Sequence, residues 1–591
     1  MRDPDEILHA VFGFEAFRGT QRQVIDRVMA GKDALAIMPT GAGKSLCYQI
    51  PALARPGTAL VVSPLIALMH DQVRAADAVG IKAATLTSAD ANRAETADRF
   101  RAGDLDLLYV APERASMPQF QDMLGQVPLS LVAIDEAHCI SEWGHDFRPD
   151  YRLLRPLLDR LEGVPRLGLT ATADEATRKD VLAQLGMEDE ALIVAGFDRP
   201  NIRYVIRPRT GLKQQVKALI DEQPGPGIVY APSRAKAERL AAEIAATGRN
   251  AAVYHAGLPP QERAKNQADF VASEDMVICA TIAFGMGIDK PDVRFVAHAG
   301  IPKSIEAYYQ ETGRAGRDGD PAEAHLFWGA EDFSRARQRI ESEIEPDRRA
   351  GERSRLNALG ALVETAGCRR AILLRHFGED PPERCGNCDN CLEPPTAIDA
   401  TETARKLLSA VYRTGQRFGV GHVVAVLAGK PSDRIVDLGH DRLSVWDILS
   451  DDEEPMVRPV ARALQTREAL VLTDHGGLAL GPNARSILRG EEAVELVLPP
   501  KRQRRRRKNQ EANPVGDPLF DALRERRREI AAENAVPPYV IFHDSTLREM
   551  AAAKPASIAE MSKIAGVGEA KLARYGEDFL RVIEELAGTG S

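Results

Sequence analysis

The sequence of 591 residues is poor in cysteine and has neither a long apolar run nor an excess of positive charge. Seven cysteines are few for this length, and in a reducing compartment a cluster of them suggests metal binding rather than disulfides. No run reaches the roughly eighteen apolar residues of a membrane-spanning helix. The N-terminal segment MRDPDEILHAVFGF mixes both charge signs and lacks the basic-then-apolar order of a secretory signal. We therefore expect a cytoplasmic protein without a membrane segment.

The net charge is -9, from 77 basic and 86 acidic residues. This balance argues against a protein that binds nucleic acid over its whole surface, because phosphate contacts need Lys and Arg. It leaves open a protein with a single basic track. The hydrophobic content of 44% is that of a globular protein, and a chain this long exceeds one hydrophobic core. We expect several domains.

Residues 1 to about 340 alternate short apolar runs with helical stretches. The first series of runs is ALAIM (34–38), ALVVS (59–63), LDLLYV (105–110), LVAID (131–135) and RLGLT (166–170). The second series is GIVYA (227–231), AAVYH (251–255), MVICAT (276–281), VRFVAH (293–298) and AHLFW (324–328). Strands that alternate with helices predict parallel sheets, which bind ligands beyond the carboxyl ends of the strands. Two series predict two α/β domains, 1–200 and 201–345, joined near Asp198–Arg203.

The rest of the chain divides by composition. We expect a helical module ending in cysteines at 346–395 and a helical domain with short terminal strands at 396–500. Residues 501–508 carry seven basic residues in eight, so 501–516 is predicted to be a basic linker. Residues 517–591 have helical periodicity throughout and predict a small all-helical domain.

A glycine-rich segment, MPTGAGKS at 38–45, follows the first predicted strand and opens a predicted helix. Gly41 and Gly43 permit a tight turn whose N–H groups face phosphate oxygens at the helix N-terminus. Lys44 would reach the β- and γ-phosphates of ATP, and the hydroxyl of Ser45 would bind Mg²⁺. Met38 stands where the strict pattern has glycine, so the segment alone leaves an ordinary turn open.

An acidic pair, Asp135–Glu136, ends a later apolar strand and precedes His138. Asp135 is placed to hold Mg²⁺, directly or through water, and Glu136 to orient and deprotonate the attacking water. A helix cap with an acidic first turn is the alternative. The phosphate loop at domain-scale distance favours ATP hydrolysis. His138 is either a coupling residue or a packed side chain.

Two further segments extend the predicted ATP site. Upstream of the phosphate loop, Phe17 offers an aromatic face, and the amide of Gln21 can pair with both the donor and the acceptor groups of adenine. In the second α/β domain, Arg314 and Arg317 would point together on one helical face and stabilise charge on the γ-phosphate from across a cleft. A pair of surface arginines is the alternative. The predicted catalytic residues are Lys44, Asp135, Glu136, Arg314 and Arg317. The predicted nucleotide-binding residues are Phe17, Arg18, Gln21, Thr40, Gly41, Gly43, Lys44 and Ser45.

The order of these segments resembles that of superfamily 2 helicases. The matching segments are FRGTQ, MPTGAGKS, VVSPLIALMHDQV, DEAH, GLTATA, GIVYAPSR, VICATIAFGMGIDKP and YYQETGRAGRDG. The run CISEWGHDFRP, directly after DEAH, resembles the aromatic-rich loop of RecQ helicases. The resemblance extends over nearly the whole chain. It implies an α/β architecture of two tandem RecA-like domains, followed by a zinc-binding module, a winged helix and an HRDC domain.

The RecQ resemblance also implies an activity and partners. The expected activity is that of an ATP-dependent 3′→5′ DNA helicase that loads on single strands and unwinds duplex or branched DNA in recombination and repair. Expected partners are single-stranded and branched DNA, single-stranded DNA-binding protein and repair factors, with the protein acting as a nucleoid-associated monomer. An RNA helicase, or an ATP-regulated DNA-binding scaffold that does not unwind, are the alternatives.

By position in the family motifs, several residues would sense DNA and couple it to hydrolysis. Stacking of bases on aromatic rings and guanidinium groups tolerates any sequence, which suits the aromatic-rich loop. A hydrophobic plug between helices is the alternative for that loop. Thr170 belongs to the motif linked to domain movement, and Thr281, with Asp289, to the motif that faces the DNA backbone. The predicted DNA-binding or coupling residues are Trp143, His145, Phe147, Arg148, Thr170, Thr281 and Lys571.

Four clustered cysteines predict a metal site. Cys385, Cys388 and Cys391 are spaced to close on one ion, and Cys368 would complete the set from a preceding helix. Four thiolates suit a structural, tetrahedral Zn²⁺ with no open position. An iron–sulfur cluster also takes four thiolates, but the family resemblance favours zinc.

The two C-terminal domains give weaker signals. Residues 439–446 resemble the start of a winged-helix recognition region, but the acidic run 451–454 would repel phosphate, and we expect the strand-separating hairpin to be short or absent. Residues 564–571 have the glycine spacing of a helix–hairpin–helix turn, which aims N–H groups at phosphate beside Lys571. A structural turn or a protein-docking face is the alternative.

Overall fold

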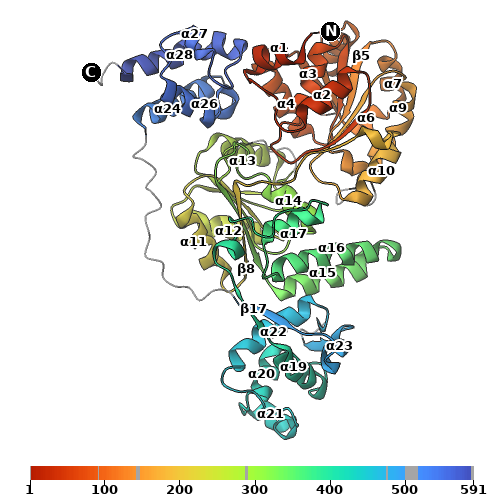
Figure 1. The fold of residues 1–591 in the computed structure, drawn as a ribbon, viewed down its shortest axis with the longest axis vertical. Coiled ribbons are helices and arrows are strands. Elements are labelled where there is room, and N and C mark those ends of the chain that lie inside the picture. The colour runs from red at the N-terminus through yellow and green to blue at the C-terminus, as the bar shows by residue number, and fades with distance from the viewer. Residues whose placement is uncertain are drawn as a thin grey trace.

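The computed structural model describes residues 2–88, 90, 92–141, 147–285, 290–473, 477–498, 517–534 and 536–587. Along the chain, two α/β domains are followed by a cysteine module, a mixed domain and a C-terminal helical domain (Figure 1). The predicted linker 501–516 lies outside the described residues, as do Trp143, His145 and Asp289. Within the described parts, no helix combines the length and apolar character needed to cross a membrane.

The first α/β domain is built on a parallel sheet of seven strands in the order β3-β4-β2-β5-β6-β1-β7. The strands are β1 (Ala34–Ile37), β2 (Thr58–Val62), β3 (Ala83–Leu86), β4 (Leu107–Val110), β5 (Leu129–Ile134), β6 (Arg166–Thr170) and β7 (Leu192–Val194). The five predicted strands are confirmed. The two that sequence patterns missed, β3 and β7, are the edge strands, which are short and have a neighbouring strand on one side only.

Helices and helical turns surround this sheet. They are α1 (Pro4–Ile7), η1 (Leu8–Phe12), α2 (Gln21–Met29), α3 (Leu46–Ala54), α4 (Ile66–Ala78), α5 (Arg93–Arg101), α6 (Pro112–Ala115), α7 (Pro118–Leu124), η2 (Ala137–Ile140), α8 (Pro149–Arg152), α9 (Arg155–Arg160), α10 (Glu175–Leu185) and η3 (Asp189–Ala191).

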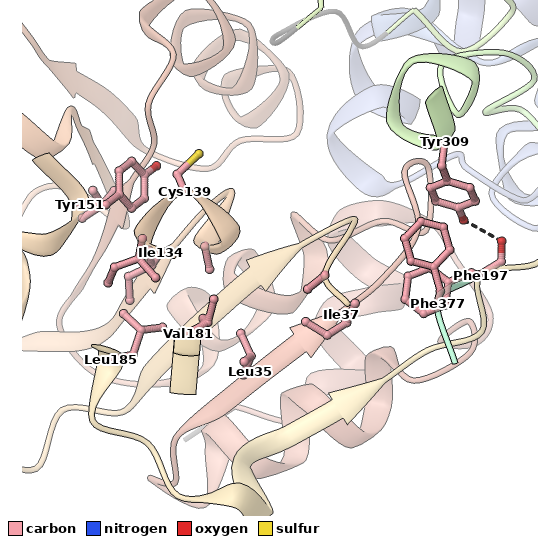
Figure 2. Packing of buried hydrophobic residues seen from close by; sticks show 14 of the residues in the cluster. Leu35, Ile37, Ile134, Cys139, Tyr151, Val181, Leu185, Phe197, Tyr309 and Phe377 are labelled. Atoms are coloured by element: carbon pink, nitrogen blue, oxygen red, sulfur yellow. Dashed lines mark hydrogen bonds between the residues drawn. The ribbon is translucent and has the colours of Figure 1, made fainter. Parts of the chain in front are cut away.

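The alternation of side chains along β1 explains how the first sheet is covered. Leu35 and Ile37 belong to one buried cluster, whereas Ala34 and Ala36 belong to another on the opposite face. Both faces are therefore packed, as a parallel sheet requires. Figure 2 shows Leu35 and Ile37 in the cluster that also holds Ile134 of β5 and residues of α10.

The second α/β domain has a parallel sheet of six strands in the order β10-β11-β9-β12-β13-β8. The strands are β8 (Ile202–Pro208), β9 (Gly227–Tyr230), β10 (Ala251–Tyr254), β11 (Val277–Ala280), β12 (Phe295–His298) and β13 (Ala322–Trp328). Its helices are α11 (Leu212–Glu222), α12 (Arg234–Ala245), α13 (Pro260–Ala272) and α14 (Ile305–Thr312). All five predicted strands are confirmed, and the missed strand β8 is again at an edge.

The next elements form the cysteine module and the mixed domain. The long helix α15 (Ala330–Glu343) packs against both α16 and α22. The cysteine module comprises α16 (Pro346–Glu364), α17 (Arg369–His376) and α18 (Asp389–Leu392). The mixed domain comprises β14 (Thr396–Asp399), α19 (Thr401–Arg413), α20 (Val420–Leu427), α21 (Asp433–Asp437), η4 (His440–Arg442), α22 (Glu454–Thr466), β15 (Leu470–Leu472), β16 (Leu478–Leu480), α23 (Ala484–Arg489) and β17 (Glu495–Leu498).

The mixed domain has a core of its own and two small antiparallel pairs, β14 with β17 and β15 with β16. The β15–β16 pair is a hairpin with strands of three residues each, as expected for a short hairpin. The acidic run is less repulsive than its sequence suggests. Glu453 accepts from Lys406 at 2.8 Å, and Glu454 pairs with Lys430.

The C-terminal helical domain comprises α24 (Pro518–Glu533), α25 (Pro538–Ile541), α26 (Asp544–Ala553), α27 (Ile558–Met561) and α28 (Glu569–Ala587) around its own core. It lies beside the N-terminal helices of the first α/β domain and next to α13 of the second (Figure 1). It therefore contacts both α/β domains, although the chain reaches it only after the mixed domain.

Candidate active site

The predicted phosphate loop connects β1 to α3. Gly41 and Gly43 have φ angles of +84° and +72°, which only glycine adopts without strain. A Cβ on Gly43 would lie 2.5 Å from Nε2 of Gln21, so a side chain there would displace the Gln21 amide. Met38 is buried and its N–H donates to the carbonyl of Thr170 at 2.9 Å. This residue continues the core of β1, which explains why it is not glycine.

The loop holds polar groups that suit a nucleotide. Nζ of Lys44 lies 3.2 Å from the carbonyl oxygen of Met38, so the lysine side chain folds back toward the start of the loop. The hydroxyl oxygen of Thr40 is buried and makes no hydrogen bond within the described residues. Left-handed glycines, a lysine and a buried unpaired hydroxyl fit the binding of phosphate oxygens. Ser45 immediately precedes α3, at the position predicted for the Mg²⁺ ligand.

Gln21 braces the phosphate loop. Its Nε2 donates to the carbonyl of Ala42 at 2.9 Å, and its Oε1 accepts from the N–H of Arg18 at 2.8 Å. Both ends of the amide are therefore engaged within the protein. Phe17 lies next to it under the guanidinium of Arg22, at 5.7 Å. Adenine binding by Phe17, Arg18 and Gln21 stays a prediction, and it would need the amide to exchange partners.

The acidic pair lies at the carboxyl end of β5. Asp135 is half-buried beside Ser63, and the Tyr151 hydroxyl donates to its carbonyl at 2.9 Å. Burial and the neighbouring Glu136 carboxylate raise the pKa of Asp135 to about 7, whereas Lys44 lowers it. Glu136 has a φ of +48°, which is rare for a residue with a side chain. Backbone strain of this kind concentrates at functional sites.

His138 joins the acidic pair to the Thr170 motif. Its Nδ1 lies 2.8 Å from Oγ1 of Thr170 and 3.3 Å from the carboxylate of Glu136. The same hydroxyl of Thr170 lies 3.3 Å from both the N–H and the carbonyl of Thr172. The sequence left coupling and packing open for His138. Its ring is buried, and a coupling role through Glu136 and Thr170 stays a prediction.

The two arginines do not share a helical face, so that expectation is wrong. Helix α14 ends at Thr312, and Arg314 and Arg317 lie in the turns that follow. The stem of Arg317 packs on the phosphate loop, with Cγ 3.2 Å from where a Cβ on Gly41 would stand. Arg314 is buried, and its Nη2 lies near Gly285 instead. Of the two, Arg317 is closer to the phosphate loop.

Of the predicted DNA-contacting residues, Phe147, Arg148 and Thr281 lie in the described part of the chain. The Arg148 guanidinium donates to the carbonyl of Pro64 at 3.3 Å, and Arg152 lies 5.3 Å from the Phe147 ring. The backbone N–H of Thr281 donates to the carbonyl of Tyr254 at 3.2 Å, so this hydrogen bond does not involve the Thr281 hydroxyl. The neighbouring Ile282 is 69% exposed, an apolar residue that the sequence analysis did not single out.

The four predicted cysteine ligands come together. Their sulfur atoms all lie within 4.8 Å of one another, with Cys385 to Cys391 and Cys368 to Cys388 both at 3.9 Å. A tetrahedron with Zn–S distances of about 2.3 Å has edges of about 3.8 Å, so the set fits a closed Zn²⁺ site. The other three cysteines, Cys47, Cys139 and Cys279, are buried.

The glycine turn of the C-terminal domain packs against the first α/β domain. The N–H of Gly566 donates to the carbonyl of Gly13 at 2.8 Å, and a Cβ on Gly568 would lie 2.4 Å from the Val11 carbonyl oxygen. The ammonium of Lys571 lies over the Phe542 ring, and burial lowers its pKa to about 8. The turn is thus a docking face in this arrangement. Its DNA binding through Lys571 stays a prediction.

Ion pairs complete this docking, and sequence patterns missed them. Arg548 pairs with Asp320, and Arg524 with Glu274 at 3.0 Å. Both acceptors belong to the second α/β domain. Arg527, which is buried, also reaches Glu274 at 3.4 Å. Single charges on amphipathic helices carry no signal that distinguishes a docking contact from a solvated face.

Comparison with known proteins identifies relatives over the full chain. Five family models match in succession: DEAD/DEAH box helicase at 18–181, helicase conserved C-terminal domain at 211–319, RecQ zinc-binding at 330–392, RQC domain at 394–505 and HRDC domain at 517–583. An ATP-dependent DNA helicase RecQ from Pasteurella multocida is 43% identical, covering 98% of this chain and 93% of the relative. One from Haemophilus influenzae is 42% identical, covering 98% and 95%. One from Bacillus subtilis is 38% identical, covering 98% of both.

Proposed function

The chain belongs to the RecQ family of ATP-dependent DNA helicases, and we propose that it moves 3′→5′ along single-stranded DNA to unwind duplex and branched substrates. Its two RecA-like sheets, zinc-binding module, RQC winged helix and HRDC domain account for all the described folded parts. ATP, Mg²⁺ and Zn²⁺ are its cofactors, and the zinc site is structural. We propose the direction of movement along DNA, the preferred DNA substrates and the roles of individual residues.

For hydrolysis, we assign the phosphates to the loop from Thr40 to Ser45. When bound, Mg²⁺ would neutralise charge on the β- and γ-phosphates, held by Ser45 and Asp135. Glu136 would orient the attacking water and accept its proton, and its short distance to His138 supports a fixed carboxylate. Lys44 would bind the γ-phosphate as charge develops on it.

The second RecA-like domain would supply the remaining charge. Arg317 already packs on Gly41, so it needs little movement to reach a γ-phosphate bound there. We assign it the role of arginine finger, with Arg314 as a buried neighbour that supports the same turn.

The single observation that carries the motor assignment is the close contact of His138 with both Glu136 and Thr170: its Nδ1 lies 3.3 Å from the Glu136 carboxylate and 2.8 Å from the Thr170 hydroxyl. It joins the catalytic carboxylate to the motif implied to move the domains. We propose that DNA bound by the aromatic loop and by Thr281 acts on hydrolysis through this contact. Trp143, His145, Phe147 and Arg148 would be the sensors of that loop. Lys571 would contact DNA only when the HRDC domain leaves its docked position.

We further propose that the protein works as a monomer associated with the nucleoid in the cytoplasm. Single-stranded DNA-binding protein and repair factors are the partners expected for recombination and repair intermediates.

The decisive experiment measures unwinding of duplexes with a 3′ or a 5′ tail, with and without ATP. The proposal expects ATP-dependent unwinding of the 3′-tailed duplex and little of the 5′-tailed one. Lys44→Ala and Glu136→Gln serve as controls, and unwinding by either variant would contradict the motor assignment. Stimulation of the ATPase by RNA more than by single-stranded DNA would favour an RNA helicase. Hydrolysis without unwinding would favour a scaffold.

A further inference from the structure

One arginine of the linker between the two RecA-like domains binds both sides of the ATP cleft. The linker crosses between β7 and β8, and Arg199 lies within it. Its Nη1 donates to the carbonyls of Thr40 at 2.8 Å and Gly313 at 3.1 Å. Its Nη2 donates to the carbonyls of Ala315 and Gly316, both at 2.9 Å. A single guanidinium therefore joins the phosphate loop to the turn that carries Arg314 and Arg317.

The chemistry of these four contacts requires arginine. Four carbonyl oxygens converge on one group, and only a guanidinium offers enough donors in a fixed plane to satisfy them. The N–H groups of a phosphate loop face the phosphate, so its carbonyls need partners elsewhere. Arg199 supplies that partner for Thr40. A lysine would keep the charge but could not hold all four carbonyls in one geometry.

The two segments that Arg199 joins are in direct contact. A Cβ on Gly313 would lie 3.3 Å from Cβ of Thr40. The stem of Arg317 packs on Gly41, as described above. The space between the turn and the phosphate loop is therefore too narrow for a side chain at Gly313 unless Thr40 is displaced.

The backbone that carries Arg199 is itself anchored. The Tyr309 hydroxyl donates to the carbonyl of Phe197 at 2.6 Å, and the Phe197 ring stacks on Phe377 with centroids 4.6 Å apart (Figure 2). Glu379 accepts from the N–H of Phe197. Tyr309 belongs to the second RecA-like domain, and Phe377 and Glu379 directly follow α17. Arg199 therefore reaches toward the first domain from a base fixed to the second.

We propose that Arg199 is a positioning residue for ATP hydrolysis. It holds the backbone carbonyls of the residues on either side of Arg314 and of the residue before Arg317. The same guanidinium binds the phosphate loop through the carbonyl of Thr40. It touches no reacting atom and acts through these two arginines and the loop. Movement of the loop on nucleotide binding is thereby transmitted to the linker between the domains. This inference rests on the roles proposed above for Arg314 and Arg317.

The test compares Arg199→Lys and Arg199→Gln with a matched control, Arg370→Lys. Arg370 is buried and donates to the carbonyls of Pro200 in the linker at 3.1 Å and of Ile202 at the start of β8 at 2.9 Å; neither of these carbonyls lies in the cleft. Three quantities are measured in the full-length protein with single-stranded DNA: kcat and KM for ATP, the affinity for ADP, and the gain in affinity when aluminium fluoride is added to ADP. The thermal unfolding midpoint reports any structural effect.

We expect both Arg199 variants to lose about tenfold or more in kcat while KM and ADP affinity change less than about threefold. The gain from aluminium fluoride, which mimics the transferring phosphoryl group, should disappear in these variants and persist in Arg370→Lys. A wild-type gain in either Arg199 variant would overturn the inference. So would equal losses in Arg199→Lys and Arg370→Lys that follow their unfolding midpoints, because the role would then be structural.

Arg317→Ala, measured in parallel, separates this inference from the proposed function. If Arg317→Ala hydrolyses ATP like the wild type, the finger assignment fails and the positioning role fails with it. If Arg317→Ala is impaired and the Arg199 variants are normal, only the positioning role fails. Impairment of both, with loss of the aluminium fluoride gain in both, supports the two together.

Discussion

Nδ1 of His138 lies 2.8 Å from Oγ1 of Thr170. The two residues follow or end neighbouring parallel strands, β5 and β6, whose carboxyl ends meet at one edge of the first sheet. That edge is where parallel α/β sheets place their ligands. The contact therefore brings the acidic pair and the Thr170 motif together over 32 residues of sequence.

The His138–Thr170 contact should carry coupling between hydrolysis and movement. Thr170→Val keeps the shape of the side chain and removes the hydroxyl. We expect this variant to lose about tenfold in unwinding rate at saturating ATP, with a smaller loss in ATPase rate. His138→Gln should behave similarly. The double variant should lose no more than either single one, since both remove the same interaction. Fully additive losses would show that the two residues act separately.

Loss of one cysteine ligand should unfold the zinc-binding module. Cys385→Ser should reduce bound zinc and the yield of soluble protein together, because a structural site contributes its binding free energy to folding. Metal content per chain is measured by elemental analysis. Cys279→Ala is the control, since Cys279 is a buried thiol of β11 far from the cluster in sequence, and it should keep its zinc. Full zinc retention in Cys385→Ser, or iron and sulfide in the wild type, would contradict the assignment.

Glu364 should make the junction between α16 and the winged helix sensitive to pH. Burial raises the pKa of Glu364 to about 7, although Arg467 lies 3.7 Å away and lowers it. Because the folded pKa is raised, the folded state binds more protons than the unfolded state between about pH 4.5 and 7. Stability should therefore fall as pH rises through this window, by up to about 3 kcal/mol.

The variant Glu364→Gln tests this dependence. It should raise the thermal unfolding midpoint at pH 8 and change it little at pH 5, which flattens the pH profile. Glu341→Gln, at an exposed site on α15, is the control and should leave the profile unchanged. A profile for Glu364→Gln that parallels the wild type would refute the role of this carboxyl group.

The docked HRDC domain should detach when its charges are reversed. Arg548→Asp places like charges against Asp320 and should favour release of the domain from both RecA-like domains. Fluorescence transfer between labels on the HRDC domain and the first RecA-like domain would report this release. Adding Asp320→Arg should restore the pairing and the transfer. The effect should weaken with added salt, because exposed ion pairs are screened. Unchanged transfer in Arg548→Asp would mean that the Arg548–Asp320 pair is dispensable and that the remaining contacts, including the ion pairs to Glu274, hold the domain in place.

Local chemistry made much of the ATP and zinc sites predictable. The glycines next to Lys44, the carboxylate pair at a strand end and the closely spaced thiols each act together with residues nearby in the chain. Their chemistry is therefore visible as a short pattern in the sequence. The buried strands were predictable for the same reason, since both faces of a parallel sheet must be apolar. Three edge strands were missed. Strands β3 and β7 have only four and three residues, and β8 interrupts its apolar residues with Arg203 and Arg207.

The sequence by itself determined the family, the domain order, the phosphate loop, the acidic pair and the four cysteines. It could not determine that Arg314 and Arg317 leave the helix, because Gly313 and Gly316 end it only in the context of the cleft. Only the tertiary structure decided that Arg199 bridges the cleft, that Gln21 braces the loop and that the HRDC domain docks across both RecA-like domains. These contacts join residues up to 553 positions apart, as in the hydrogen bond between Gly566 and Gly13. Each depends on the three-dimensional convergence of donors and carbonyls, which leaves no periodicity or spacing in the sequence.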